Sequence, residues 1–305
     1  MGKDRAAAGW RARFLQQQVL PADYLDEAGR WFDPVAVQLA AHCFGASRPL
    51  LVGINGAQGS GKTTLSDYLC QWLVQEAGLR ALSLSIDDVY LTRTERQQLA
   101  AQVHPLLLTR GVPGTHDVPL LLQTLDALGS APGTLPVAAP RFDKARDDRL
   151  PAAQWPRVQP PLDIILLEGW CLGARPQAPE ALATPCNALE REEDSDGRWR
   201  RYANDCLAGA YARLHQRVDR WLMLRAPSFD EVLRWRSEQE RKLAAGPRRA
   251  GGNRVMDEPA LARFVQHYER LTRHCLATLP PRMDVVWELD RERQISAWRG
   301  PGVPA

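Results

Sequence analysis

The stretch that decides the fold is Gly53–Thr64, GINGAQGSGKTT. It follows an apolar run at 50–54 and precedes a segment whose apolar residues recur at helical spacing. Glycines let consecutive backbone N–H groups turn toward one anion, and the N-terminus of the next helix adds its dipole at the same place. Positions 56–63 fit the pattern G-x-x-x-x-G-K-[ST] in the strand–loop–helix context that this motif requires. We therefore predict a phosphate-binding loop rather than a glycine turn that merely joins a strand to a helix.

The loop predicts ATP and Mg²⁺ as cofactors. Lys62 is expected to bridge the β- and γ-phosphates, and the hydroxyl of Thr63 is expected to bind Mg²⁺. The residues expected to contact the nucleotide are Gly56, Ala57, Gln58, Gly59, Ser60, Gly61, Lys62, Thr63 and Thr64.

The composition indicates a globular protein and argues against several classes of function. The chain has 305 residues, of which 45% are hydrophobic, enough to bury a core. Lysine and arginine number 39 against 36 aspartates and glutamates, so no broad cationic field points to nucleic acid or an anionic membrane. No apolar run approaches the ~18 residues of a membrane span and no secretory signal is evident, so we expect a cytoplasmic protein. The six cysteines form no CxxC pair and predict neither a zinc site nor a disulfide framework.

Five short apolar runs predict buried strands. They lie at 50–54, 81–86, 162–167, 218–225 and 284–289. Helical segments separate the runs, so we expect an α/β protein with the P-loop NTPase fold. Its doubly wound, five-stranded and mainly parallel sheet has helices on both faces.

The chain is expected to form one domain overall. Residues 1–48 predict an N-terminal helical extension packed on the core, and residues 49–305 predict the nucleotide-binding domain. The stretches at 131–140 and 245–254 are rich in proline and glycine and predict loops rather than domain linkers. A capping box at Ser228 and an Asp-x-Pro start at Asp257 predict two late helices.

A phosphate-binding loop alone does not distinguish a switch, a motor and a phosphotransferase. A GTPase would carry [NT]-K-x-D after a late strand, and the sequence has none. A motor ATPase usually ends its second acidic strand in Asp-Glu, whereas IILLEGW delivers the single Glu168, which can bind Mg²⁺ directly or through water.

The segment SIDDVYLT favours a kinase. Asp87 and Asp88 follow the second predicted strand, at the sheet edge where ligands of open α/β folds collect. A carboxylate there can take a proton from an acceptor hydroxyl, and we assign Asp87 as this base. The alternative is that one or both aspartates cap the following helix. Asp88 and Tyr90 are expected to contact the acceptor.

Several motifs in this order resemble one kinase group. The chain is similar from about residue 48 to 295 to P-loop small-molecule kinases of the uridine kinase and phosphoribulokinase group, and within it to the plant-type D-glycerate 3-kinases and their bacterial and fungal relatives. The motifs that carry the resemblance are GAQGSGKTTL, SIDDVYLT, LLLTRGVPGTHDVPLL, PRFDKARDDRLP, LEGWCLG, NALERE and LARFVQHYERL…VVWELDRERQI.

The resemblance implies a base at Asp87, a magnesium group at Glu168, and an arginine-bearing lid formed by the helix with RWRSEQERK. The lid arginines are Arg234, Arg236 and Arg241, of which Arg236 and Arg241 are expected to act on the transferred phosphoryl group. The alternative for each arginine is a solvated face paired with nearby glutamates.

Two loops are candidates for acceptor binding. In TRGVPGTHD, Arg110 offers a fork for a carboxylate, and His116 and Asp117 flank it, although His116 alone is more often structural. In PRFDKARDDR, Asp143 and Lys144 can meet a hydroxyl and a phosphate. The acids and arginines of residues 186–211 either form a solvated helix face or contact the acceptor.

These patterns predict an ATP- and Mg²⁺-dependent phosphotransferase acting on a hydroxyl of a small anionic metabolite, with D-glycerate as the expected acceptor. The alternatives are a kinase for a nucleoside, pantothenate or a sugar phosphate, and a nucleotide-binding regulatory ATPase without an acceptor. The sequence does not define the oligomeric state.

Overall fold

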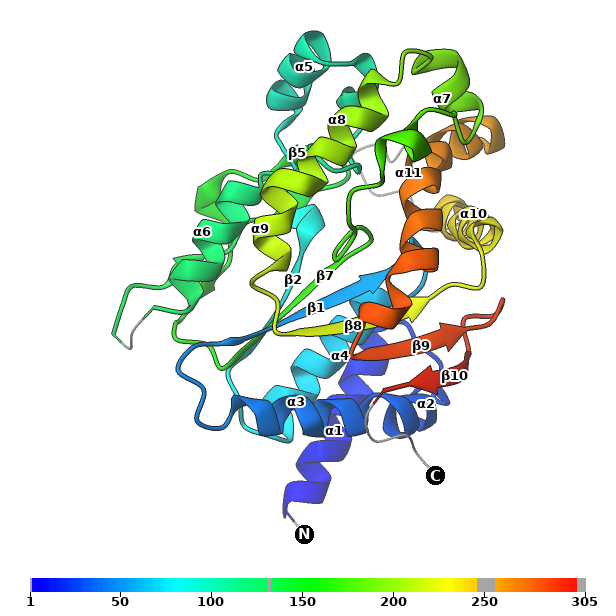
Figure 1. The fold of residues 1–305 in the computed structure, drawn as a ribbon. Coiled ribbons are helices and arrows are strands. Elements are labelled where there is room, and N and C mark those ends of the chain that lie inside the picture. Colours follow the sequence, from blue (N-terminus) through cyan, green and yellow to red (C-terminus); the bar gives the residue numbers. More distant parts are fainter. Residues whose placement is uncertain (1, 131–132, 246–255, 301–305) are drawn as a thin grey trace.

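A six-stranded sheet lies at the centre of the molecule, with helices on both faces (Figure 1). The computed structural model describes residues 2–130, 133–245 and 256–300. The strands of the sheet run in the order β10-β9-β8-β1-β7-β2. Their bounds are β1 Leu50–Gly56, β2 Ala81–Ser85, β7 Ile164–Gly169, β8 Arg220–Arg225, β9 Val285–Leu289 and β10 Ile295–Arg299.

The predicted α/β fold is confirmed, and the sheet has one strand more than expected. All five predicted strands are present and pair in parallel. The sixth, β10, is antiparallel to β9 at the edge of the sheet. Three of its five residues are exposed, so it has no apolar run of the kind that marks a buried strand.

Alternate residues of the central strands enter two separate cores. On β1, Val52 and Ile54 pack into one core and Leu51 into the other, and β7 alternates in the same way. The first core is covered by α1 Gly2–Gln18, α2 Tyr24–Trp31, α3 Asp33–Cys43, α4 Lys62–Gln75 and part of α10 Phe229–Ala245. The second is covered by α6 Val118–Leu128, α9 Ala212–His215 and much of α11 Glu258–Thr278.

The remaining helices lie beyond the carboxyl edge of the sheet, and the remaining strands pair outside the sheet. Three helices, α5 Arg93–Gln102, α7 Ala188–Glu193 and α8 Arg198–Cys206, lie beyond that edge (Figure 1). Four two-residue strands form two small ribbons, β3 Val137–Ala138 with β6 Arg157–Val158, and β4 Phe142–Asp143 with β5 Asp148–Arg149. The stretch 131–140, predicted as a loop, therefore contains a short strand. Among the described residues, no helix is both long and apolar enough to cross a membrane.

The two predicted late helices begin where the sequence signals place them. At the start of α11 the Asp257 side chain accepts a hydrogen bond from Ala260 N at 2.9 Å. Helix α10 begins one residue after Ser228, and the carboxylate of Glu231 is paired with Arg234 and Arg291.

Tyr68 of α4 is a centre of contact with the N-terminal helices. Tyr68 is fully buried, and its hydroxyl donates to Asp33 Oδ1 at 2.7 Å. Its ring contacts four aromatic rings of the first 32 residues, namely Trp10, Phe14, Tyr24 and Phe32. Because α4 is also the helix that opens at the phosphate-binding loop, the N-terminal segment supports the loop from behind.

Tyr68→Ala should therefore lower the free energy of unfolding by about 3–5 kcal/mol, the usual cost of deleting a buried aromatic ring. Tyr68→Phe keeps the ring contacts and loses only the bond to Asp33, so it should cost about 1 kcal/mol. Denaturant unfolding of both variants measures the difference. Equal losses would contradict a role for ring packing.

Candidate active site

The phosphate-binding loop connects β1 to α4 through a turn that only glycine can form at two positions. Gly59 and Gly61 have φ values of 80° and 89°, in the left-handed region. A Cβ atom at Gly59 would lie 2.8 Å from Cβ of Trp235 on α10, and none fits there. At these glycines the loop backbone faces the cavity in front of α4 without side chains, as the sequence predicts.

Two oxygens beside the loop fit a divalent cation. Thr63 Oγ1 donates to Glu168 Oε1 at 3.0 Å, and Lys62 Nζ lies 3.8 Å from Glu168 Oε2. Glu168 is only 4% exposed, and its Oε2 has no hydrogen-bond partner among the described residues. Burial raises the pKa of Glu168, with Lys62 opposing the shift. A hydroxyl and an underused carboxylate are the hard oxygen ligands that Mg²⁺ prefers, so the pair fits the predicted ion.

Asp87 is held as a carboxylate by two donors. After β2 the chain forms a short 3₁₀ turn, and within it Asp87 Oδ1 accepts from the Tyr90 hydroxyl at 2.9 Å while Oδ2 accepts from Lys144 Nζ at 2.7 Å. Burial opposes its ionisation, but Lys144 and Lys62 outweigh burial and lower the pKa of Asp87. The group is therefore ionised and weakly basic.

Asp88 has a structural role that differs from the role of Asp87. Its carboxylate pairs with Arg141 and accepts from Phe142 N at 3.4 Å, which fastens the β4–β5 ribbon to the end of β2. Burial raises the pKa of Asp88. Asp88 is not among the described residues that line the cavity, whereas Asp87 is.

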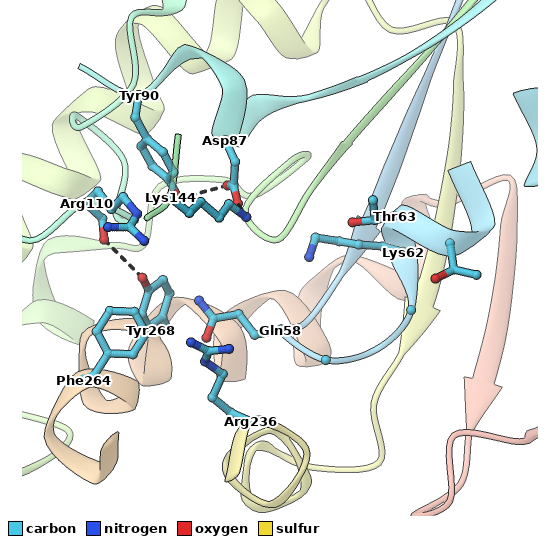
Figure 2. A pocket seen from close by; sticks show the side chains of 13 residues that line it. Gln58, Lys62, Thr63, Asp87, Tyr90, Arg110, Lys144, Arg236, Phe264 and Tyr268 are labelled. Carbon is cyan, nitrogen blue, oxygen red and sulfur yellow. Dashed lines mark hydrogen bonds and ion pairs between the residues drawn. The ribbon is translucent and has the colours of Figure 1, made fainter. Parts of the chain in front are cut away.

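A cavity of about 280 Å³ joins the loop to Asp87. In Figure 2, Asp87 and Lys144 lie on one side of the cavity, with Lys62 across from them and Arg236 and Gln58 pointing in from below. The described residues that line it are Gln58, Gly59, Gly61, Lys62, Thr63, Thr64, Asp87, Tyr90, Arg110, Lys144, Arg236, Phe264 and Tyr268. Residues from six separate segments thus converge on one polar space.

Arg110 lines the far end of this cavity and is held in place by its surroundings. Its guanidinium pairs with Asp147 and lies 5.5 Å from the ring centre of Phe142, and the Tyr268 hydroxyl donates to its carbonyl oxygen at 3.1 Å. Tyr268 and Phe264 come from α11. Their apolar spacing on that helix indicates core packing, and nothing in the sequence distinguishes a cavity wall from a core face.

Three predicted acceptor residues lie behind the cavity wall. His116 stacks on Tyr90 with ring centres 4.4 Å apart, and burial lowers its pKa to about 4, so it is neutral at pH 7. Asp117 caps α6 through Leu120 N at 3.0 Å, and Asp143 accepts from Ala145 N at 2.9 Å. The structure assigns these groups contacts that support the site, and none of the three lines the cavity among the described residues.

Two of the three arginines predicted on α10 have described side chains, and these two lie differently. Arg236 reaches the cavity, with its guanidinium 5.9 Å from the ring centre of Phe264. Arg234 instead contacts the carbonyl of Arg291 and pairs with Glu231. The side chain of Arg241, and residues 246–254 that follow α10, lie outside the described residues.

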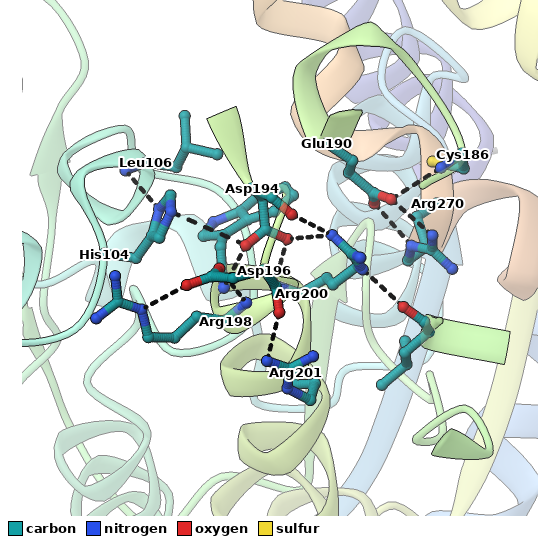
Figure 3. Close-up of polar contacts among 12 residues, drawn as sticks. His104, Leu106, Cys186, Glu190, Asp194, Asp196, Arg198, Arg200, Arg201 and Arg270 are labelled. Carbon is teal, nitrogen blue, oxygen red and sulfur yellow. Dashed lines mark hydrogen bonds and ion pairs between the residues drawn. The ribbon is translucent and has the colours of Figure 1, made fainter. Parts of the chain in front are cut away.

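Three charged residues of 186–211, namely Glu190, Asp194 and Arg200, are buried in ion pairs (Figure 3). The others are exposed, as in a solvated face: Arg191, Glu192, Glu193, Asp196, Arg198, Arg201 and Asp205. Asp194 pairs with Arg200 at 2.8 Å, and Glu190 pairs with Arg270 of α11 at 2.6 Å. His104 lies near Asp194, but its Nδ1 accepts from Leu106 N at 3.3 Å, which leaves the proton on Nε2. The nitrogen facing Asp194 is therefore a donor and not a metal ligand. The pair between Glu190 and Arg270 holds this segment against α11. Among the described residues, none of 186–211 lines the cavity.

Comparison with known proteins identifies relatives of this chain and proteins that share its fold. The chain is 30% identical over 238 residues to the chloroplastic D-glycerate 3-kinase of Arabidopsis thaliana, covering 76% of this chain and 48% of that protein. It is 32% identical over 228 residues to an uncharacterized kinase of Schizosaccharomyces pombe, covering 72% of this chain and 79% of that protein. The chain thus spans about half the length of the Arabidopsis relative. A solved D-glycerate 3-kinase of Cryptococcus neoformans has the same fold, with a TM-score of 0.66 at 24% identity over 92% of this chain and 99% of that one. No family model matches the chain.

Gly59→Ala should weaken ADP binding by at least tenfold, because the new Cβ meets Trp235 and shifts the loop. Gly78→Ala is a matched control, since Gly78 also has a left-handed φ of 69° but has nothing within 4 Å of the added Cβ. Both variants should lose roughly 1–2 kcal/mol of stability from backbone strain. Calorimetric titration with Mg·ADP checks the difference, and equal affinities for the two variants would refute the steric argument.

Proposed function

Because the chain belongs to the family of P-loop kinases that includes D-glycerate 3-kinase, we propose that it transfers the γ-phosphoryl group of ATP to a hydroxyl of a small anionic metabolite. D-glycerate is the acceptor that we propose first. The observation that carries the proposal is the placement of Asp87 and Lys62 on opposite sides of one cavity that ends at Arg110 (Figure 2). A nucleotide switch without an acceptor does not require a carboxylate and an arginine in the cavity of its phosphate-binding loop.

The phosphate side of the proposed reaction rests on the loop. Backbone N–H groups from Gly59 to Thr63 and the ammonium of Lys62 would hold the phosphates, and Thr63 with Glu168 would hold the Mg²⁺. Magnesium bound there neutralises phosphate charge. Arg236 enters the cavity from α10, where its charge would offset the negative charge that grows on the phosphoryl oxygens.

The acceptor side rests on Asp87 and Arg110. Arg110 offers a planar fork that suits a carboxylate, and Asp87 would orient the acceptor hydroxyl and take its proton. A weakly basic Asp87 suits phosphoryl transfer, because the loose transition state requires little proton removal before the bond to phosphorus forms. Tyr90 and Lys144 position this carboxylate through its two oxygens.

The experiment that tests the function is acceptor-stimulated release of ADP. Purified protein is incubated with Mg·ATP and separately with D-glycerate, L-glycerate, uridine, pantothenate and ribulose 5-phosphate, against a control without acceptor. Stimulation by D-glycerate alone is the expected result. Stimulation by another compound would keep the kinase and replace its acceptor, and no stimulation by any of them would favour a regulatory ATPase.

Two variants serve as controls for this assay. Asp87→Asn should lower turnover roughly 10²-fold or more with ADP binding nearly unchanged, because the group acts on the acceptor. Lys62→Ala should abolish transfer with every acceptor. Full activity of Asp87→Asn would show that the base lies elsewhere.

The pH dependence of the reaction should depend on Lys144. Asp87 has a lowered pKa, so its protonation limits kcat/KM only below the ordinary carboxyl value of about 3.9. In Lys144→Ala the largest lowering charge is lost and burial dominates, so the acidic limb should move to higher pH by about one unit or more. Lys144→Arg keeps the charge and should keep the limb in place. An acidic limb that is the same in all three proteins would exclude this coupling.

A further inference from the structure

A second cavity lies apart from the candidate active site, between α9 and the residues that follow β7 and α11. Helices α9 and α11 cover the same face of the sheet (Figure 1). The cavity has a volume of about 490 Å³, within the range of small-molecule sites. None of the described residues that line it also lines the cavity at the phosphate-binding loop. A ligand in this second cavity would therefore not displace a ligand at the loop.

Much of the lining of the second cavity is apolar. Trp221 of β8 lines it from the sheet, and Leu207 and Leu279 line it from the helical side. The six-membered ring of Trp221 lies close to the backbone of β1, because a Cβ atom at Gly53 would fall 2.5 Å from its Cζ3 atom. An indole ring packs well against another flat, apolar group. The cavity therefore suits a ligand with a flat apolar body.

The charged groups that line the second cavity are cations. They are Arg175 and Arg282, both exposed, and neither guanidinium forms an ion pair or hydrogen bond with another described residue. No aspartate or glutamate among the described residues lines the cavity. A guanidinium offers a planar fork for a carboxylate or a phosphate. The lining thus favours an anionic group and repels a cation.

A histidine adds a neutral donor to this lining. His215 Nε2 accepts from Gly173 N at 3.0 Å, so the proton of the neutral ring is on Nδ1. Burial lowers the pKa of His215 to about 4, and the ring is therefore neutral at pH 7. It packs edge-on against Trp221, with ring centres 5.7 Å apart. The positive charge of the lining consequently comes from the two arginines.

One part of the lining belongs to a π-helical turn. This turn, Leu207–Tyr211, joins α8 to α9, and its first two residues, Leu207 and Ala208, line the second cavity. Turns of this widened kind are rare and occur frequently at functional sites. The last residue of the turn, Tyr211, is only 1% exposed and points to a different part of the molecule.

Tyr211 connects the π-helical turn to the loop 109–117, which carries Arg110. Its hydroxyl accepts from Gly114 N at 3.2 Å and shares a hydrogen bond with His116 Nδ1 at 2.5 Å. His116 stacks on Tyr90, and Tyr90 donates to Asp87. A continuous series of contacts therefore runs from the lining of the second cavity to the carboxylate in the first.

We propose that the second cavity binds an effector that has a flat apolar body and one carboxylate or phosphate group, and that the bound effector strengthens acceptor binding through the π-helical turn. Arg175 and Arg282 would bind the anionic group, and Trp221 would contact the apolar body. A ligand that packs on Leu207 and Ala208 favours the turn as it stands in this structure, in which Tyr211 holds the loop 109–117. The coupling rests on the proposed function, because it needs an acceptor, whereas the binding does not.

Calorimetric titration of the full chain tests the binding. The probes are 2-naphthoate and 2-naphthyl phosphate, and 2-naphthamide is their uncharged counterpart. Excess Mg·ADP is present to occupy the phosphate-binding loop. At least one anionic probe should bind roughly tenfold or more tighter than the amide, and the tighter of the two identifies the preferred anion. Equal affinities for all three compounds, or binding of none, would overturn the inference.

Three variants assign the bound probe to this cavity. Arg175→Ala and Arg282→Ala remove a charge from an exposed position, and Ala212→Trp fills the space from α9. Each should weaken probe binding about fivefold or more. Arg213→Ala is the matched control, because Arg213 adjoins Ala212, is exposed and does not line the cavity. Unchanged binding in both arginine variants, or an equal loss in the control, would refute the site.

The coupling is tested by the KM for the acceptor with and without the bound probe. The probe should lower the KM for D-glycerate roughly fivefold and leave the KM for Mg·ATP unchanged. Tyr211→Phe keeps the ring and loses the bonds to Gly114 and His116, so it should still bind the probe but show no change in KM. An unchanged or raised KM in the unmodified protein, or the same decrease in Tyr211→Phe, would overturn the coupling.

The outcomes separate this inference from the proposed function. Probe binding that the arginine variants weaken, without turnover of any acceptor, would support the ligand site and overturn both phosphoryl transfer and the coupling. Turnover of D-glycerate without probe binding would overturn the inference alone.

Discussion

The pairing of β7 between β1 and β2 places the charged groups of the site. In the parallel register Glu168 lies opposite Ile54 on one side and opposite Ser85 on the other. The loop that follows β1 and the turn that follows β2 therefore begin at the height of Glu168, and Lys62 and Asp87 come to the same edge. A shift of one residue in β7 would turn Glu168 to the other face of the sheet and break the contact with Thr63. Register, more than any single hydrogen bond, determines whether the glycine loop and Asp87 line one cavity.

The central elements could be predicted from the sequence because each leaves a local signal. The five buried strands have apolar runs, and the glycine loop has a fixed spacing. The edge strand β10 leaves no such signal, since exposure at Ser296, Ala297 and Arg299 removes the pattern. In the site, Asp87 and Lys144 were both candidates, but their ion pair depends on how the β4–β5 ribbon folds back over β2. Tyr268 could not be found, because an aromatic residue at core spacing on α11 gives the same pattern whether it faces a core or a cavity.

The N-terminal helices connect the core to the nucleotide side of the molecule. Tyr68 packs aromatic rings from α1, from α2 and from Phe32, which lies between α2 and α3, against α4. On the other side, Trp235 touches Gly59 of the loop and donates to the β9–β10 turn. Helix α10, which carries Arg236 to the cavity, is thus tied both to the loop and to the turn.

The ion pair between Lys144 and Asp87 affects how readily water can react with the nucleotide when no acceptor is bound, under the proposed function. In the acceptor-free protein both oxygens of Asp87 already accept hydrogen bonds, one from Tyr90 and one from Lys144. A water molecule in the cavity meets a carboxylate with little remaining basicity and must compete with an ammonium group for it. Under the proposed function, an acceptor that binds Arg110 can use part of its binding energy for that displacement, whereas water makes no such contact. The same ion pair would therefore slow futile hydrolysis of the nucleotide while the acceptor is absent.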